Sequence, residues 1–260
     1  MANKSLLTAF AIGIYIFMYV PIFVLIVYSF DNSRLAVEWT GFTTHWYQTL
    51  FKDESIGIAL KNSLLVATIA VAASTVMGTM AAVGLARARF AGKSVMSAMI
   101  ILPIIVPEIA MAVSALILFI SMGVSLGLAS VIVAHIIFCL SYVALTVMAR
   151  LEGMNEHLNE AALDLGASPW QAFYKVTLPL IAPGILSGAL LAFVLSLDDF
   201  VITQFTAGVG ATTLPLRIYS MVKFGVSPEI NALSTLMLLV TICVTVTAEI
   251  IRQKSQTKSV

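Results

Sequence analysis

Long stretches without a single charged residue limit most strongly how this chain can fold. A helix that crosses a membrane needs about 20 largely apolar residues. The stretches that lack Asp, Glu, Lys and Arg are 5–30, 62–86, 109–149, 176–197, 200–216 and 230–248. The chain is 60% apolar and 10% charged, whereas an average soluble protein is about 45–50% apolar and about 25% charged. A soluble core cannot hide so many apolar residues, and the sequence therefore predicts an all-α integral membrane protein.

These charge-free stretches predict six transmembrane helices in a single domain over residues 1–260. The stretch 109–149 would be about 60 Å long as one helix, so it contains parts of two spans, with a turn in the small residues of 121–127. The stretch 200–216 is shorter and rich in Thr and Gly, and we expect a loop or re-entrant segment there. The predicted spans are 7–30, 60–86, 95–120, 127–149, 181–199 and 230–251.

The distribution of Lys and Arg predicts that both chain termini lie in the cytoplasm. This orientation places more basic residues inside than outside, and the short connection with Arg87 and Lys93 contributes most clearly. The connection 150–180 is then cytoplasmic and the segment 40–59 external. Aromatic residues at helical spacing in 40–59 are typical of an amphipathic helix at the membrane surface.

The sequence lacks the motifs of several other function classes. A net charge of +1 gives no case for the clustered basic surface that nucleic-acid binding requires. No H-E-x-x-H or C-x-x-C motif occurs, and Cys139 and Cys243 lie in apolar runs, so we expect no disulfide framework and no metal site. The tripeptide 92–94 resembles the end of a phosphate-binding loop, but Arg87 stands where that motif needs glycine. We therefore expect a transport subunit that binds no cofactor and does not itself hydrolyse ATP.

The cytoplasmic connection 150–180 has the sequence of a helix–turn–helix. A short helix over 160–165 begins with Glu160, as the positive end of a helix dipole prefers. Gly166 is a natural C-terminal cap, and Ser168 followed by Pro169 starts a second helix. A helical loop that projects from the membrane is a surface on which another protein can dock.

The same connection matches a known motif: E-A-A, three residues, Gly, nine residues, and then I-x-L-P. The matching residues are Glu160, Ala161, Ala162, Gly166, Leu178 and Pro179, with Val176 in place of Ile. The chain thereby resembles the permeases of binding-protein-dependent ABC importers. The resemblance implies a type I ABC importer permease fold in which this loop forms a coupling helix that inserts into an ATPase subunit. The ATPase contacts that it implies are Glu160, Ala161, Asp164 and Gly166.

The resemblance covers nearly the whole chain for the permeases of spermidine/putrescine importers, especially their second permease subunit. Supporting segments are 41–47, 195–200 and 214–220. It implies ATP-driven import of polyamines across the bacterial inner membrane. It also implies a second permease subunit, with a heterodimer as our expectation, two cytoplasmic ATPase subunits that bind ATP and Mg, a periplasmic substrate-binding protein, and membrane lipid around the spans.

Ionisable groups inside the predicted spans are the candidate substrate contacts, because such groups are costly in a membrane and functional by default. Glu108 lies within the third span, and Asp198 and Asp199 lie near the outer end of the fifth, so these carboxylates can share the outer half of one pathway. Ammonium groups also bind aromatic faces, for which Tyr142 is a further candidate. The candidate pathway residues are Glu108, Asp198, Asp199, Ser196, Trp46 and Tyr19.

Structural roles for the same residues stay open at this point. Asp198 and Asp199 can cap the following loop, and only one of them needs to face a pore because adjacent helical residues point about 100° apart. Glu108 can satisfy backbone groups that a helix kink frees. Trp46 can belong to the aromatic belt, and Ser196 can hydrogen-bond to a neighbouring helix.

Other functions also stay open. The same architecture can import another small solute, such as an amino acid derivative. A channel or secondary transporter is a second alternative, against which the ATPase-binding motif argues. An intramembrane enzyme is a third, but no nucleophile and base share a depth, and His45, His135 and His157 fall in three compartments. We expect His135 to bond to a neighbouring helix.

Overall fold

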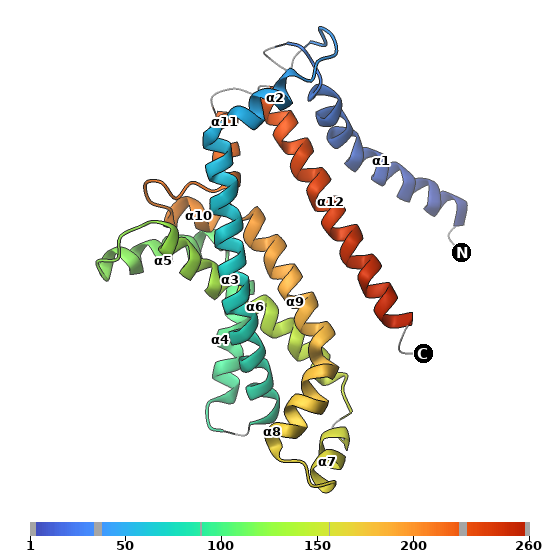
Figure 1. Ribbon diagram of the computed structural model, residues 1–260, viewed down its shortest axis with the longest axis vertical. Helices are drawn as coiled ribbons and strands as arrows, with labels where there is room; N and C mark the ends of the chain where they lie inside the picture. Colours follow the sequence, from blue (N-terminus) through green and yellow to red (C-terminus); the bar gives the residue numbers. More distant parts are fainter. Residues whose placement is uncertain (1–3, 34–37, 89, 156, 224–227, 258–260) are drawn as a thin grey trace. The chain divides into compact units, whose positions relative to one another are not determined.

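The computed structural model describes residues 4–33, 38–88, 90–155, 157–223 and 228–257. These residues form helices and contain no β-strand, which confirms the predicted all-α class (Figure 1). The helices are α1 (Lys4–Tyr28), α2 (His45–Lys52), α3 (Glu54–Arg87), α4 (Lys93–Ile105), α5 (Glu108–Ser121), α6 (Leu128–Glu152), α7 (His157–Asp164), α8 (Pro169–Ala172), the π-helix η1 (Phe173–Thr177), α9 (Leu178–Asp198), α10 (Val201–Thr206), α11 (Leu214–Lys223) and α12 (Pro228–Thr257). They belong to a first unit, Met1–Gly57 with Ile218–Val260, and a second unit, Ile58–Arg217.

In the first unit, α12 packs against α1 and α2, and hydrogen bonds link the residues after α1 to α2 and to the residues before it. A carboxylate oxygen of Asp31 accepts a hydrogen bond from the backbone N–H of Thr40 at 2.8 Å. The Ser29 and Tyr47 hydroxyl oxygens lie 2.7 Å apart. These contacts hold α2, which lies within the predicted amphipathic segment 40–59, against the end of α1. The helix ends at Lys52.

The second unit is built around α6 and α9, which pack along each other. Glycine allows the close approach: a Cβ atom on Gly188 of α9 would lie 3.2 Å from the Cα of Val143 in α6. Likewise, a Cβ on Gly78 of α3 would lie 3.0 Å from the carbonyl oxygen of Leu140 in α6. Since lipid tails are as apolar as the helices themselves, such close van der Waals contacts between small residues are a main source of helix association in a membrane.

The third predicted span, 95–120, differs from the prediction because it is not a continuous helix. It consists of α4 and α5, whose axes are bent by 110° relative to each other. Pro107 has no N–H to continue a helix and disfavours helical backbone at the residue before it. Val106 accordingly has extended backbone, with φ −69° and ψ 135°. The break places Glu108 in the first turn of α5.

Among the described residues, four helices are long and apolar enough to cross a membrane, or five if the bent pair α4–α5 counts as one span. The four are Leu7–Tyr28, Glu54–Arg87, Leu128–Glu152 and the continuous stretch Pro169–Asp198. The sixth predicted span coincides with α12, whose apolar part Pro228–Cys243 is shorter. These helices support the membrane class, and the count of six stays a prediction.

Candidate functional site

An acidic cavity of about 450 Å³ lies in the second unit where α4, α5, α6 and α9 meet. Three carboxyl groups line it, those of Glu108, Asp198 and Asp199. The ring of Tyr142 also lines it, next to Phe138, with the two ring centroids 5.1 Å apart. The structure thus brings together the three acidic candidates from the sequence and the further aromatic candidate Tyr142.

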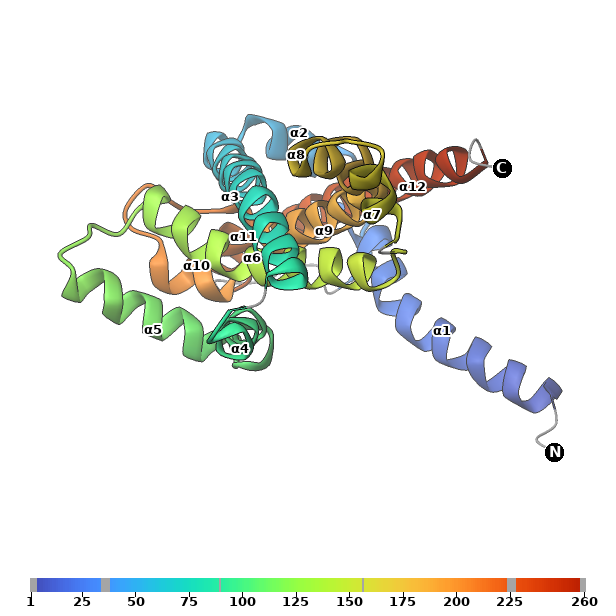
Figure 2. The same cartoon turned by 90° about the horizontal axis from the view of Figure 1, so that it is seen from below.

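Two breaks in helices position these carboxyl groups. The break at Pro107 starts α5 with Glu108, whose charge suits the positive end of the helix dipole. The helix α9 ends at Asp198 because Asp199 has extended backbone, with φ −63° and ψ 124°. The short helix α10 follows and packs on α5, as Figure 2 shows. Packing of α10 against α5 therefore brings the break at Pro107 and the break at Asp199 together in the wall of the acidic cavity.

The two adjacent aspartates differ in their surroundings. The side chain of Asp198 is exposed to the cavity, whereas Asp199 is only 6% exposed. Asp199 Oδ1 accepts a hydrogen bond from the N–H of Ile202 at 3.2 Å, and Oδ2 accepts two from Thr203, from the N–H at 2.9 Å and from the hydroxyl at 2.8 Å. Asp199 thus caps α10, and Asp198 is the aspartate that is available to a bound molecule.

A buried histidine holds Asp199 and Ser196 in place. His135 of α6 is 1% exposed, and its Nε2 lies 3.1 Å from Asp199 Oδ2 and 3.1 Å from Thr203 Oγ1. Its Nδ1 lies 2.8 Å from Ser196 Oγ. Because an ionised carboxylate only accepts, these partners favour the tautomer in which Nε2–H donates to Asp199 and Nδ1 accepts from Ser196. The expectation that His135 bonds to a neighbouring helix agrees with this geometry. The expectation that no nucleophile and base share a depth is wrong, because the Ser196 hydroxyl lies 2.8 Å from His135 Nδ1.

His135 and Thr203 are site residues that the sequence did not identify as such. Thr203 follows Asp199 by four residues and belongs to the cap of α10, but His135 lies 64 residues before Asp199, so no spacing motif links all three. For His135, the available signal was the cost of a histidine inside a span without a hydrogen-bond partner. Ser196 belongs to the same network, behind Asp199.

The two aromatic candidates of the first unit have contacts of their own. Trp46 of α2 is half-buried, and its indole N–H donates a hydrogen bond to the carbonyl oxygen of Asp31 at 2.7 Å. Tyr19 of α1 is exposed. Trp46 therefore has a structural role in the turn after α1, and the pathway role of both residues stays a prediction.

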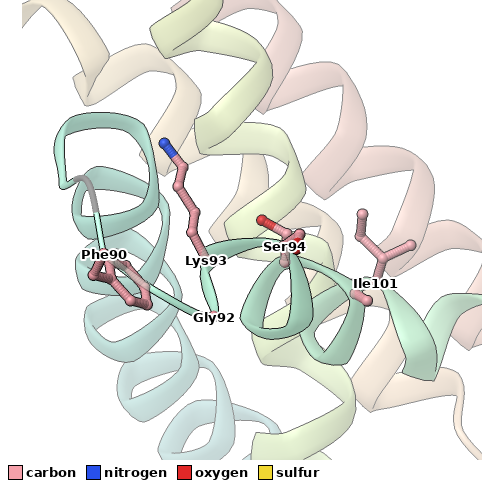
Figure 3. A pocket seen from close by; sticks show the side chains of 7 residues that line it. Phe90, Gly92, Lys93, Ser94 and Ile101 are labelled. Carbon is pink, nitrogen blue, oxygen red and sulfur yellow. The ribbon is translucent and has the colours of Figure 1, made fainter.

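A larger cavity, of about 700 Å³, lies at the turn between α3 and α4 and has different chemistry. Its lining includes Phe90, Lys93, Ser94 and Ile101, with Lys93 as its charged side chain (Figure 3). A cavity whose charge is positive is unsuited to a cation. The acidic cavity is therefore the candidate site for a cationic ligand. Within the described residues, no group of His, Cys, Asp and Glu side chains could hold a metal ion.

The connection 150–180 forms the helix–turn–helix that the sequence predicts. The helix α7 begins at His157 and ends at Asp164, and Gly166 follows with φ +87°, the left-handed conformation that glycine adopts at helix ends. Ser168 Oγ accepts from the N–H of Gln171 at 3.3 Å, and Gln171 Oε1 accepts from the N–H of Ser168 at 2.9 Å. This reciprocal capping box, with Pro169 after it, confirms the predicted start of α8.

The exposed face of this connection combines acidic and apolar side chains. The four predicted ATPase contacts, Glu160, Ala161, Asp164 and Gly166, are all exposed. Leu165 is 89% exposed and Trp170 71% exposed at the end of the second unit that carries α7 and α8 (Figure 1). Large apolar side chains that protrude together with charges are typical of a protein docking surface.

Residues 74–256 match the family model described as binding-protein-dependent transport system inner membrane component. The chain is 41% identical over 255 residues to the spermidine/putrescine transport system permease protein PotC of Haemophilus influenzae, covering 98% of this chain and 99% of the relative. It is 43% identical over 229 residues to the putrescine transport system permease protein PotI of Escherichia coli, covering 85% and 82%.

Two solved structures have a similar fold at low sequence identity. One is a bacterial ABC transporter involved in the import of the acidic polysaccharide alginate, with a TM-score of 0.74, 16% identity and 95% coverage of both chains. The other is the MetNI methionine ABC transporter, with a TM-score of 0.61, 21% identity and coverage of 81% of this chain and 98% of that one. At these identities the likeness shows the shared permease architecture.

Proposed function

Because this chain belongs to the family of binding-protein-dependent transport system inner membrane components, we propose that it is a permease subunit of an ATP-driven importer of polyamines. The observation that carries this proposal is the cavity lined by Glu108, Asp198 and Asp199. Carboxyl groups that share one site in a membrane protein are costly and point to a cationic substrate. The relatives PotC and PotI are permeases for spermidine and putrescine by name, and both molecules carry ammonium groups separated by flexible apolar chains.

The geometry suggests how a polyamine binds. Asp198 and Glu108 offer carboxylates to two ammonium groups, and the aromatic rings of Tyr142 and Phe138 line the cavity beside them. A cation over an aromatic face gains about 0.5–2 kcal/mol. Asp199 contributes negative charge from within the wall, since its oxygens are occupied by α10 and His135. Such a site binds cargo transiently, as passage through a pore requires.

The partners follow from the exposed connection 150–180. We propose that Glu160, Ala161, Asp164 and Gly166 contact a cytoplasmic ATPase subunit, with a second ATPase on a second permease. The ATPases bind ATP and Mg, and this chain binds no cofactor. A periplasmic binding protein delivers the polyamine from outside, and both termini of this chain lie in the cytoplasm. When the ATPases close, they move the coupling helices, and this movement opens the pore outward.

Uptake of labelled putrescine and spermidine tests the proposal in cells that lack this chain. We expect the wild type to restore uptake and Asp198→Asn to reduce it about tenfold or more, because a charge-assisted contact is worth about 1.5–3 kcal/mol. Glu38→Gln is the matched control, since it removes an exposed carboxylate outside the cavity. Equal uptake with and without the wild-type chain would remove the polyamine assignment. Competition by amino acids but not by polyamines would favour the other small-solute importer.

A further inference from the structure

Arg87, the last residue of α3, binds the connection 150–180 at three points. Its Nη2 donates hydrogen bonds to the hydroxyl of Thr177 and, at 3.4 Å, to Asn159 Oδ1. Its Cζ lies 6.0 Å from the centroid of the Phe173 ring, in cation–π geometry. Asn159 belongs to α7, while Phe173 and Thr177 belong to η1. One guanidinium thus joins α3 to both halves of the helix–turn–helix.

The contacts converge on a buried hydroxyl in an unusual piece of backbone. Thr177 has no exposed surface, and its hydroxyl oxygen lies 3.5 Å from Asn159 Oδ1. The element η1 is a π-helix between α8 and α9, and such segments are rare and occur frequently at functional sites. Because η1 is continuous with α9, a movement of α7 and α8 passes directly into α9 along the backbone.

The other end of α3 is bonded to the segment that follows α10. Asn62 Nδ2 donates to the carbonyl oxygens of Gly210 at 3.1 Å and Thr212 at 2.9 Å. Ser63 Oγ accepts from the N–H of Leu214 at 2.8 Å. A continuous segment runs from α9 through Asp199 and α10 to residues 207–214. These hydrogen bonds therefore attach the end of that segment to α3 near Asn62. If α9 moved while α3 stayed in place, the segment 199–214 would be strained between them, and its residues Asp199, Phe200 and Val201 line the acidic cavity.

We infer that Arg87 is a positioning residue that makes α3 and α9 move together when the coupling helix moves, so that ATP hydrolysis is converted into displacement of the cavity wall. This inference rests on the proposed docking of the ATPase at 150–180. The planar guanidinium suits the task because it binds two acceptors and an aromatic face at once, which a lysine ammonium does not. The role concerns transmission of movement and is separate from contact with substrate or ATPase.

The test is the number of polyamine molecules taken up per ATP hydrolysed, measured in proteoliposomes that contain the complete importer and loaded binding protein. We expect Arg87→Gln to lower this ratio about tenfold, within the range of residues that carry coupling, while ATP hydrolysis and subunit assembly persist. Thr177→Val should lower the ratio in the same direction, and the double variant should add little to either single change. Lys93→Gln removes a positive charge from the neighbouring turn and should keep the wild-type ratio.

An unchanged ratio for both Arg87→Gln and Thr177→Val would overturn the inference. The inference would also be overturned if Arg87→Gln lowered uptake and ATP hydrolysis by the same factor and released the ATPase from the permease. That result would assign Arg87 to docking of the ATPase. If Arg87→Gln does not reach the membrane, Thr177→Val carries the test alone. Failure of the wild-type complex to take up polyamines on ATP addition would instead contradict the proposed function.

Discussion

Asp198 and Asp199 are neighbours in the chain, but they have different structural roles because their surroundings differ. Asp198 is exposed in the cavity, while Asp199 is buried and accepts hydrogen bonds from Ile202 and Thr203. His135 lies against the same carboxylate from α6. At the scale of single residues, one aspartate is exposed in the cavity and the other holds the helix break together.

This difference predicts unequal effects on stability. Asp199→Ala leaves the donors of His135 and Thr203 buried without their acceptor, and we expect it to destabilise the protein by about 2 kcal/mol. Asp198→Ala removes an exposed group and should change stability by no more than about 0.5 kcal/mol. Thermal unfolding of the purified variants in detergent measures both. Equal unfolding temperatures for the two variants would contradict the assignment.

The bond between His135 and Asp199 predicts that their substitutions are not additive. In a double-mutant cycle of His135→Ala and Asp199→Ala, we expect a coupling of about 0.5–3 kcal/mol, because either single change already breaks the shared contact. The pair His135→Ala and Asp198→Ala is the matched control and should be additive. Additivity in both cycles would show that the buried contact contributes no stability.

The sequence predicted the carboxylates of the site better than the residues that hold them. Depth along predicted helices was enough to predict that Glu108, Asp198 and Asp199 lie near one another, and all three line one cavity. The network around His135 could not be predicted, because it depends on how α6 and α9 face each other. The pathway role of these residues, and of Trp46 and Tyr19, stays a prediction.

At the scale of elements, local sequence signals predicted where helices begin and end, but the sequence did not predict the angles between helices. The caps at Gly166 and Ser168 follow from a few neighbouring residues, and the structure has both. Pro107 shows where a helix is interrupted, but the bend of 110° depends on packing of α5 against α10. Pro107 therefore explains why 95–120 is two helices, and tertiary contacts decide the angle between them.

Close packing of α3 against α6 predicts a contrast between two glycines of one helix. A Cβ on Gly78 would lie 3.0 Å from backbone and side-chain atoms of α6, whereas one on Gly84 would meet nothing within 4 Å. We expect Gly78→Ala to cost about 1–3 kcal/mol through overpacking. Gly84→Ala should be neutral or stabilising by up to about 1 kcal/mol, since alanine favours helix. Thermal unfolding in detergent tests the pair, and an equal response would show that α3 and α6 separate readily.

The exposed apolar face of the connection 150–180 predicts where the ATPase binds. Leu165→Glu places a charge on a side chain that is 89% exposed, and we expect it to reduce co-purification of the ATPase about tenfold by desolvation of that charge in the interface. Val209→Glu changes a fully exposed side chain after α10 and should leave co-purification intact. If the Leu165→Glu variant still co-purified with the ATPase, the ATPase would have to bind at another surface.

At the scale of the whole molecule, the chain is an all-α permease of the ABC importer class whose described residues divide into two units. Composition and charge-free stretches were enough to predict the membrane class, and the loop motif was enough to indicate the family. The number of spans is harder to predict because α4 and α5 are bent and the apolar part of α12 is short. Six spans in one domain over 1–260 stay a prediction.

The most direct measurement is the position at which a photoreactive spermidine analogue cross-links in the assembled importer. We expect adducts on residues that line the acidic cavity, around Glu108, Tyr142 and Asp198, and their loss in the presence of excess spermidine. Adducts that resist competition, or that fall instead at the cavity of Phe90 and Lys93, would contradict a polyamine pathway through the carboxylates.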